Sequence, residues 1–392
     1  MGGATVARVF DDVELGYLRD VLQSGQLGWT EGRMVTRFEE AYAKLVGAKH
    51  GIARNNAMNG LAQAVAISGA GTGTEVICDP IVHFGGVATL AFNAVPRFAD
   101  VKYDTYLMDP ESVRKNITPL TKALIVTNLW GLCAELDEIR GICDEHDIFM
   151  IEDCAHVIGS YWKGKHAGTY GDLGVFSFQQ GKHMTTGDGG MIVTDREDIH
   201  YKLYHEWAFS GESPAFMTLN FRMNEETAAI GLGQTQRVMG YVEEYTKNLD
   251  IWNEAISDCK WLRQRTVPAG AKPSGYIWAC LWEGDKHGLE YENFKAVCRE
   301  LEAPLRFGFN QKPAYEFDIF KVSTAYHQPD CPVRCPFYTA KSDYRYQPGL
   351  TPVAADVLPR MVTSGLIEVP LAETQRRANL LKAAIKRVEW MG

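Results

Sequence analysis

A lysine, a carboxylate and a hydroxyl lie close together in one stretch of the chain, residues 151–195. Asp153 ends an apolar run, Ser177 lies near the end of a second run, and Lys182 follows just before a glycine-rich turn. Taken singly, Lys182 can be a solvated side chain and Asp153 a helix N-cap or a solvated loop acid. Pyridoxal 5′-phosphate (PLP) needs all three groups: a lysine amine for a Schiff base, an acid beside its ring nitrogen and a donor for its phosphate. The pattern therefore predicts a PLP site.

Seven short apolar segments must position these groups. Stretches with helical periodicity, such as residues 61–68 and 136–145, lie between them. Strands that alternate with helices are typical of an α/β protein with a mainly parallel sheet, whose functional groups gather at the carboxyl ends of the strands. The expected strands are residues 51–54, 76–79, 97–100, 124–128, 149–153, 175–178 and 191–194.

The pattern changes after residue 224. Residues 225–261 contain no proline and few glycines, which predicts long helices, whereas the chain from Pro268 onward mixes prolines with a short strand at 276–282 and a closing helix at 371–388. We therefore expect two domains, a large one at 1–245 that binds the cofactor and a smaller α+β one at 246–392.

Composition excludes several classes of protein. The 392 residues are 46% hydrophobic and 23% charged, as in a globular protein, and a net charge of −9 without blocks of like charge argues against nucleic-acid binding. Nine unevenly spaced cysteines favour a reduced compartment, and neither an apolar leader nor a membrane-length apolar run is present. We expect a cytoplasmic protein that binds neither membranes nor a metal, since no cluster has metal-ligand spacing.

One glycine-rich run imitates a nucleotide site. Residues 69–74 resemble a dinucleotide fingerprint, but they follow an expected helix and precede a strand, the reverse of the order that cradles a phosphate. We interpret them as a helix-ending turn.

The segment that contains Lys182 also matches a longer pattern. It resembles the signature of the DegT/DnrJ/EryC1/StrS family of sugar and cyclitol aminotransferases, E-D-x-A-[QH]-x-x-G, then G-x-x-G-D-x-x-x-[FS]-S-[FM], then K-x-x-x-x-G-[ED]-G-G. Further likeness lies at residues 24–39, 118–122 and 220–223, and it weakens beyond residue 265. The matching residues of the signature are Glu152, Asp153, Ala155, His156, Gly159, Gly168, Gly171, Asp172, Phe176, Ser177, Phe178, Lys182, Gly187, Asp188, Gly189 and Gly190.

The resemblance implies a fold type I PLP-dependent enzyme with a seven-stranded sheet and a role for each matched residue. Lys182 would form the internal aldimine and carry the proton, Asp153 would pair with the pyridinium nitrogen, and His156 would contact the ring. Ser177 would bind the phosphate, and Asn220 would reach the phosphate of the neighbouring subunit. A homodimer with shared active sites is therefore expected.

Two positions depart from the family pattern. The phosphate-binding S-G-T turn is replaced by Asn56, Ala57 and Met58, so the backbone donors of Ala57 and Met58 remain while a threonine hydroxyl is lost. The aromatic residue that stacks on the ring is Phe84, for which a core phenylalanine is the alternative. His83 before it is unusual, and a structural histidine is its simplest interpretation.

The predicted reaction is transamination. An amino donor, L-glutamate or L-glutamine, would load the cofactor, which would then aminate a keto-sugar or keto-cyclitol in a biosynthetic pathway. Residues 178–185 favour the cyclitol and aminohydroxybenzoate branches of the family over the nucleotide-sugar branch. The alternatives are a PLP-dependent dehydratase or aromatising enzyme of the same family, and a non-catalytic partner protein with this fold.

Overall fold

The computed structural model describes residues 8–29, 32–206, 219–321, 331–340 and 344–391. Its centre is a sheet of seven strands in the order β1-β9-β8-β5-β4-β2-β3, and it matches the seven predicted segments. All strands run parallel except β9, which is antiparallel to both of its neighbours. The strands are β1 (His50–Arg54), β2 (Glu75–Cys78), β3 (Val95–Phe98), β4 (Thr121–Thr127), β5 (Phe149–Asp153), β8 (Leu173–Ser177) and β9 (Gly190–Thr194).

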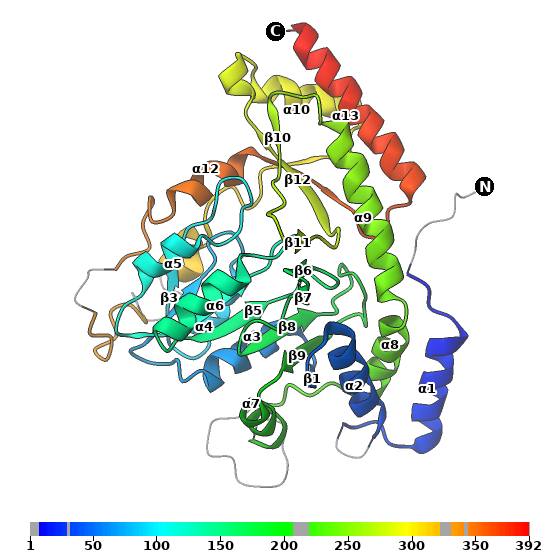
Figure 1. Ribbon diagram of the computed structural model, residues 1–392, viewed down its shortest axis with the longest axis vertical. Coiled ribbons are helices and arrows are strands. Elements are labelled where there is room, and N and C mark those ends of the chain that lie inside the picture. The colour runs from blue at the N-terminus through cyan, green and yellow to red at the C-terminus, as the bar shows by residue number, and fades with distance from the viewer. Residues whose placement is uncertain (1–7, 30–31, 207–218, 322–330, 341–343, 392) are drawn as a thin grey trace.

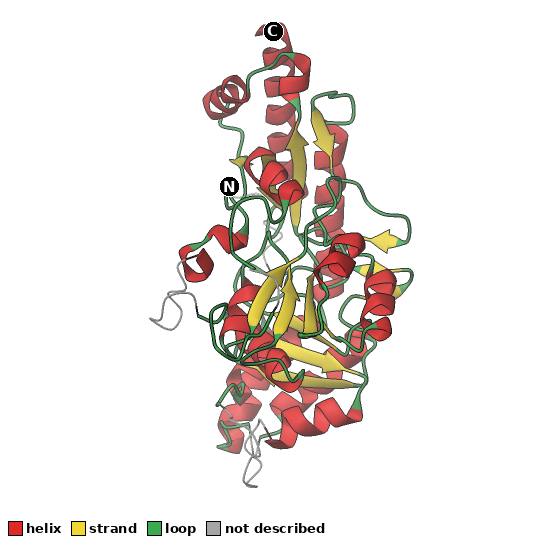
Figure 2. Cartoon of the chain, turned by 90° about the vertical axis from the view of Figure 1, so that its left-hand side faces the viewer, coloured by secondary structure: helices red, strands yellow, loops and turns green. Residues whose placement is uncertain are grey.

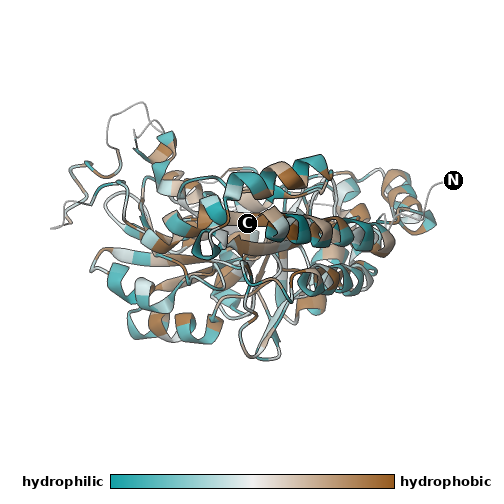
Figure 3. Ribbon diagram, turned by 90° about the horizontal axis from the view of Figure 1, so that it is seen from above, coloured by the Kyte–Doolittle hydropathy of each residue, from teal (hydrophilic) through white to brown (hydrophobic). Residues whose placement is uncertain are grey.

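Helices cover both faces of this sheet, so its strands are buried almost throughout (Figure 2). Alternate residues of one strand enter different cores, as Ile77 and Val76 of β2 do. Side chains such as Ile77 pack with α2, α6 and α8, whereas those such as Val76 pack with α3 and α4. Because neither face meets water, the strands are continuous apolar runs. In Figure 3, apolar colour follows the interior and polar colour the outside of the helices.

The helices α3 to α6 connect consecutive strands of the large sheet, while α1 and α2 precede β1 and α7 and α8 follow β9. Several begin at a side chain that caps the first turn, including Asp11 before α1, Asn56 before α3 and Asn224 before α8. The bounds are α1 (Asp12–Ser24), α2 (Met34–Val46), α3 (Ala57–Ile67), α4 (Phe84–Leu90), α5 (Pro110–Asn116), α6 (Leu136–Glu145), α7 (Glu197–Tyr201), a π-helical turn (Lys202–Glu206) and α8 (Glu225–Thr235). The glycine run at 69–74 is a helix-ending turn, as expected, because α3 ends just before Gly69, whose φ is +79°.

A second core lies at the other end of the molecule, at the top of Figure 1. Its sheet is antiparallel, in the order β10-β12-β14-β13, and stacked tryptophans such as Trp252 and Trp278 fill the space below the helices. Its elements are α9 (Val238–Ala255), β10 (Leu262–Gln264), β12 (Ile277–Trp282), α10 (Tyr291–Glu300), β13 (Arg306–Phe307), β14 (Met361–Gly365) and α13 (Leu371–Met391). The helix α12 (Pro352–Arg360) precedes β14, but its buried residues pack in the core of the large sheet. The predicted strand at 276–282 and the closing helix are both present.

Some short elements join the two parts of the molecule: the large part, built on the seven-stranded sheet, and the small part, built on the antiparallel sheet. A small sheet places β11 (Ala271–Lys272) on one side of β6 (Tyr161–Trp162) and β7 (Lys165–His166) on the other. The chain around α11 (Asp318–Lys321) returns to the large sheet, where Tyr315, Phe320 and Tyr346 pack against Phe98. The helix α9 passes through residue 245 without a break (Figure 1). The domain boundary at that residue stays a prediction.

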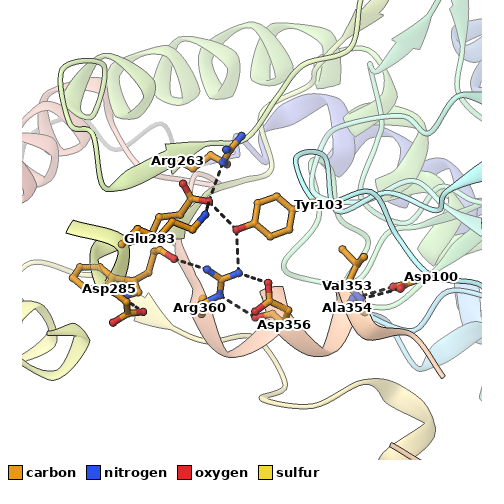
Figure 4. Close-up of polar contacts among 11 residues, drawn as sticks. Asp100, Tyr103, Arg263, Glu283, Asp285, Val353, Ala354, Asp356 and Arg360 are labelled. Carbon is orange, nitrogen blue, oxygen red and sulfur yellow. Dashed lines mark hydrogen bonds and ion pairs between the residues drawn. The ribbon is translucent and has the colours of Figure 1, made fainter. Parts of the chain in front are cut away.

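A polar network also links the two parts (Figure 4). Tyr103, which follows β3, donates a hydrogen bond of 2.7 Å to Glu283 and accepts one of 3.0 Å from Arg360. Arg263 and Lys286 bind the same Glu283 oxygen at 3.2 and 2.9 Å. Burial opposes ionisation of Glu283, but its hydrogen bonds with Lys286 and Tyr103 and the charge of Arg263 outweigh burial and lower its pKa to about 2.

None of the helices within the described ranges has the length and apolar character needed to cross a membrane.

Candidate functional site

The carboxyl ends of two neighbouring parallel strands bring Asp153 and Ser177 to the same edge of the sheet. Asp153 is the last residue of β5 and Ser177 the last residue of β8, and Asp153 lies opposite Val175 in the strand register. Both side chains are buried. The strand-to-loop transition thus places a carboxyl and a hydroxyl side by side at the edge where α/β proteins bind ligands.

Lys182 lies on the loop between β8 and β9, which folds back on itself. Its backbone N–H donates to the carbonyl oxygen of Gln179 at 3.0 Å, and Thr186 donates to that of Phe178 at 3.0 Å. The return turn passes through Gly187, whose φ of +87° favours glycine. This loop holds the lysine backbone over the carboxyl ends of the strands.

The first turn of α3 forms the opposite wall. Asn56 caps the helix by accepting a 2.8 Å hydrogen bond from the backbone of Asn59. The N–H groups of Ala57 and Met58 precede that donor and, as at the start of any α-helix, have no acceptor within the helix. Gly190 approaches this turn so closely that a Cβ atom would lie 2.6 Å from Asn56, so no larger residue fits there. A helix start of this kind is suited to a phosphate.

These elements enclose one cavity of about 270 Å³. Among the residues that were predicted for the site, Asp153, His156, Ser177 and Lys182 line it together with Ala57, Met58 and Phe84. The complete lining is Asn56, Ala57, Met58, Leu61, Val82, Phe84, Asp153, Ala155, His156, Ser177, Gln179, Lys182 and Asp188. The sequence separates these residues by more than a hundred positions, and the sheet brings them into contact with a single volume.

Burial determines the electrostatics of the lysine. It lowers the pKa of Lys182 to about 8, although the negative charge of Asp153 opposes that shift. A substantial fraction of this side chain is therefore a neutral amine near physiological pH, the form that attacks a carbonyl carbon.

Asp153 and His156 also have shifted pKa values. Burial raises the pKa of Asp153, while a hydrogen bond from the backbone of Ala155 and the charge of Lys182 oppose the increase. Burial, with the charge of Lys182, lowers the pKa of His156 well below its usual range, so the imidazole is neutral. Its Nδ1 atom is buried and has no partner in the described structure. A buried polar atom without a partner beside this cavity fits a bound polar ligand.

Phe84 lines the cavity, and His83 precedes it as the residue before α4. Phe84 is 45% exposed, so the alternative of a core phenylalanine is wrong. The His83 ring packs on Phe84 at 4.3 Å and on Phe317 at 5.6 Å, and half-burial lowers its pKa. His83 is not among the lining residues.

Asn220 is the predicted site residue that the fold does not bring to this cavity within one chain. It is exposed, and its Oδ1 accepts a 3.2 Å hydrogen bond from the backbone of Arg222. Next to it, the carbonyl of Phe221 accepts from Asn55, the neighbour of the helix cap Asn56. Its role toward a second subunit stays a prediction.

Two contacts of Lys182 were missed from the sequence. Tyr276, directly before β12, accepts a 3.2 Å hydrogen bond from Lys182 Nζ, and Arg8 donates a 2.8 Å hydrogen bond to the Lys182 carbonyl oxygen. They lie 94 and 174 residues away along the chain. Neither stands in a local pattern, so only the assembled fold identifies them.

Among the described residues, one group combines metal-ligand types: His50, Glu197 and His200. His50 Nε2 lies 3.0 Å from Glu197, and the two histidine rings stack 4.1 Å apart at 10°. A metal ion bound by imidazole lies near the plane of the ring, and one ion cannot lie in two parallel planes at that separation. In this arrangement the group is a histidine–glutamate contact with a second imidazole stacked on the first.

A family model settles the relationship of the chain to known proteins. The model of the DegT/DnrJ/EryC1/StrS aminotransferase family matches residues 10–361. The chain belongs to this family. PLP is the cofactor of the family, and the cavity fits it: an amine of lowered pKa, a buried carboxyl, a neutral imidazole with a free nitrogen and a helix start surround one volume.

Curated relatives of this family member act on sugars and cyclitols by name. A GDP-perosamine synthase of Vibrio cholerae is 32% identical over 63% of this chain and 69% of its own length. A putative L-glutamine:3-amino-2,3-dideoxy-scyllo-inosose aminotransferase of Streptoalloteichus tenebrarius is 31% identical over 64% of this chain. The match spans 62% of that second relative's own length.

Solved structures establish the fold type I architecture. A 3-amino-5-hydroxybenzoic acid synthase superposes with a TM-score of 0.82 over 99% of both chains, at 24% identity. A GDP-4-keto-6-deoxy-D-mannose-3-dehydratase of E coli with bound hydrated PLP superposes with a TM-score of 0.79 at 20% identity, over 96% of this chain and 97% of its own. The predicted fold class is confirmed.

Proposed function

We propose that this protein transfers an amino group from L-glutamate or L-glutamine to the ketone of a sugar or cyclitol, as a cytoplasmic homodimer in a biosynthetic pathway. Family membership and the names of the relatives support the reaction class. The observation that carries the proposal is the placement of the Lys182 amine, with a pKa of about 8, in the same cavity as Asp153.

The chain supplies the groups that PLP requires. Lys182 would hold the cofactor, Asp153 would face its ring nitrogen, and Phe84 and His156 would contact its ring. Ser177 and the backbone N–H groups of Ala57 and Met58 would bind the phosphate, and Asn220 would do so from a second subunit. When bound, PLP acts as an electron sink for the carbon that loses a proton.

Proton transfer falls to Lys182. As a neutral amine, its Nζ takes the α-proton of the amino donor: the carbon–hydrogen bond breaks and a nitrogen–hydrogen bond forms. As an ammonium group it then gives that proton to a carbon atom: the nitrogen–hydrogen bond breaks as a carbon–hydrogen bond forms. A pKa of about 8 suits both directions, because an acid-base group works best when its pKa lies near the working pH.

Other residues shape the surroundings of that proton. Leu61, Val82 and Met58 form apolar parts of the wall and limit the access of water. At the mouth, Asp188 and Gln179 offer polar side chains to a hydroxylated acceptor.

Two other functions compete with this proposal. A dehydratase of the family is one, and a non-catalytic partner protein is the other. The lysine at position 182 argues against the first, because family dehydratases carry histidine there, although aromatising members keep the lysine. Intact Asp153 and Lys182 argue against the second.

The visible absorption spectrum of the purified protein tests the proposal. After addition of PLP, L-glutamate or L-glutamine should convert the band of the bound cofactor, and a keto-sugar or keto-cyclitol should restore it. Lys182→Ala should abolish the conversion, while Lys163→Ala, an exposed lysine paired with Asp137, should leave it unchanged. A band that no amino donor alters, together with loss of water from a keto-sugar, would instead identify a dehydratase. No band at all would leave the non-catalytic partner.

A further inference from the structure

Tyr276 connects the small part of the molecule to the lysine of the cavity. It lies directly before β12, and its hydroxyl accepts a 3.2 Å hydrogen bond from Lys182 Nζ. The side chain is only 9% exposed. The Lys182 amine thus meets a hydroxyl from the chain directly before β12, in addition to the charge of Asp153 at the end of β5.

Two imidazole rings hold the Tyr276 ring in place. Tyr276 stacks on His156 at 4.7 Å and 18°, and on His183 at 5.4 Å and 28°. His183 is itself fully buried, and its Nε2 lies 3.1 Å from the Ser274 hydroxyl and 3.3 Å from the Ser274 carbonyl oxygen. Because stacking orients a flat ring, the hydroxyl has a defined position beside the lysine.

A phenol hydroxyl can serve an amine in both of its protonation states. It accepts a hydrogen bond from an ammonium group and donates one to a neutral amine. A carboxylate in its place would only accept and would favour the ammonium form. Burial raises the pKa of Tyr276 to about 12, so the hydroxyl keeps its proton under physiological conditions.

We infer that Tyr276 is a positioning residue that holds the Lys182 amine at one place whether it is charged or neutral. The inference rests on the proposed function, in which Lys182 takes up and releases a proton. It also follows that the antiparallel sheet must sit correctly on the large sheet for Lys182 to work, since Tyr276 directly precedes β12.

The Tyr276→Phe variant removes the hydroxyl and keeps the ring, so it is the direct test. In the cofactor-free protein, acylation of Lys182 is followed against pH by mass spectrometry of its peptide. Hydrogen bonds to charged groups are stronger than neutral ones, so loss of the hydroxyl should lower the midpoint of this profile by about half a pH unit or more. In the holoenzyme, kcat should fall about ten-fold with little change in KM for the amino donor.

Two further variants separate positioning from packing. Tyr245→Phe is the matched control, because Tyr245 is also buried and its ring lies 6.2 Å from that of His183. In this variant the midpoint of Lys182 acylation and kcat should stay at the wild-type values. Tyr276→Leu removes both ring and hydroxyl. If Tyr276→Phe behaves as the wild type while Tyr276→Leu fails, Tyr276 only packs and the inference is wrong.

The two readouts also separate this inference from the proposed function. If Tyr276→Phe shifts the acylation midpoint but the wild-type protein converts no amino donor, the positioning role is kept and transamination is rejected. A wild type that converts the donor, with Tyr276→Phe unchanged in midpoint and kcat, would reject the positioning role and keep transamination.

Discussion

The guanidinium of Arg8 binds the backbone of the residue that carries the amine: it donates a 2.8 Å hydrogen bond to the carbonyl oxygen of Lys182. It also donates one of 2.6 Å to Gln180 and forms a 2.9 Å ion pair with Glu368, beyond β14. The Arg8 side chain is 1% exposed. Residues 8–11, the N-terminal arm, therefore tie the lysine loop through Arg8 to the small part of the molecule.

Replacement of Arg8 by alanine should weaken both the fold and the site. The carbonyl oxygens of Lys182 and Gln180 would lose their charged donor, which should cost about 2–3 kcal/mol of stability and reduce kcat. Urea unfolding and steady-state kinetics measure the two effects. The control is Arg19→Ala on the exposed side of α1, for which we expect neither change. An Arg8→Ala protein as stable and active as the wild type would contradict the assigned contact.

The lowered pKa of Lys182 predicts how cofactor loading depends on pH. Only the neutral amine attacks PLP, so the loading rate of the cofactor-free protein should rise about ten-fold per pH unit below pH 8 and level off above it. Stopped-flow absorbance measures this rate. A small lysine analogue with an unperturbed amine should still be rising at pH 9. A protein profile that also rises to pH 10 would mean that burial does not shift this amine.

Asp153→Asn should keep the shape of the site and remove its charge. The amide can still accept the hydrogen bond from Ala155, so the variant should fold and bind PLP. Amino transfer should fall by about 100-fold or more, because a fixed charge beside the ring nitrogen is lost. The loading midpoint of Lys182 should also move to lower pH, since Asp153 favours its ammonium form. Undiminished turnover would remove Asp153 from the mechanism.

Met58→Thr should restore a hydroxyl at the start of α3. A hydroxyl there can donate to the phosphate in addition to the backbone, and a hydrogen bond to a charged group contributes about 1.5–3 kcal/mol. We therefore expect PLP to dissociate about ten-fold to 100-fold more slowly, measured by loss of the visible band on dialysis. Thr36→Val, on α2 and away from the cavity, serves as a control substitution. Equal or faster dissociation from Met58→Thr would place the phosphate elsewhere.

Glu283 should make the stability of the folded protein depend on pH in the acidic range. Because its pKa is lowered to about 2 in the folded protein, its ionised form contributes stability above the unfolded pKa of about 4.3, and this contribution is lost as the pH falls toward 2. Glu283→Gln should therefore lose less stability than the wild type between pH 5 and pH 2.

Tyr103→Phe should reproduce part of that difference, because it removes one donor to the carboxylate (Figure 4). Thermal unfolding at several pH values gives both comparisons. Tyr161→Phe, whose ring also lies near a lysine side chain, should follow the wild type. Parallel pH profiles for the wild type and Glu283→Gln would show that this network does not hold Glu283 ionised.

Local patterns in the sequence determined much of the seven-stranded sheet. The strands of this sheet are buried on both faces, so each is a continuous apolar run that can be recognised without its neighbours. The predicted bounds of the strands were approximate: the strand expected at 97–100 is β3, Val95–Phe98. The residues at which a strand begins and ends depend on pairing with its neighbours rather than on composition. The short strands β10, β11 and β13 were not predicted, because two or three residues leave no periodic signal.

The candidate site also combines residues that the sequence identified with contacts that only the fold creates. Asp153, Ser177 and Lys182 follow strand ends within thirty positions of one another, so their order along the chain already indicated a shared edge. Tyr276 and Arg8 reach Lys182 across 94 and 174 residues, and the free nitrogen of His156 and the lowered pKa of Lys182 exist only after burial. The sequence alone determined which groups can do chemistry and on which strands they lie. Only the tertiary structure decided their protonation and partners, because desolvation and long-range contacts arise when the two sheets and the N-terminal arm pack together.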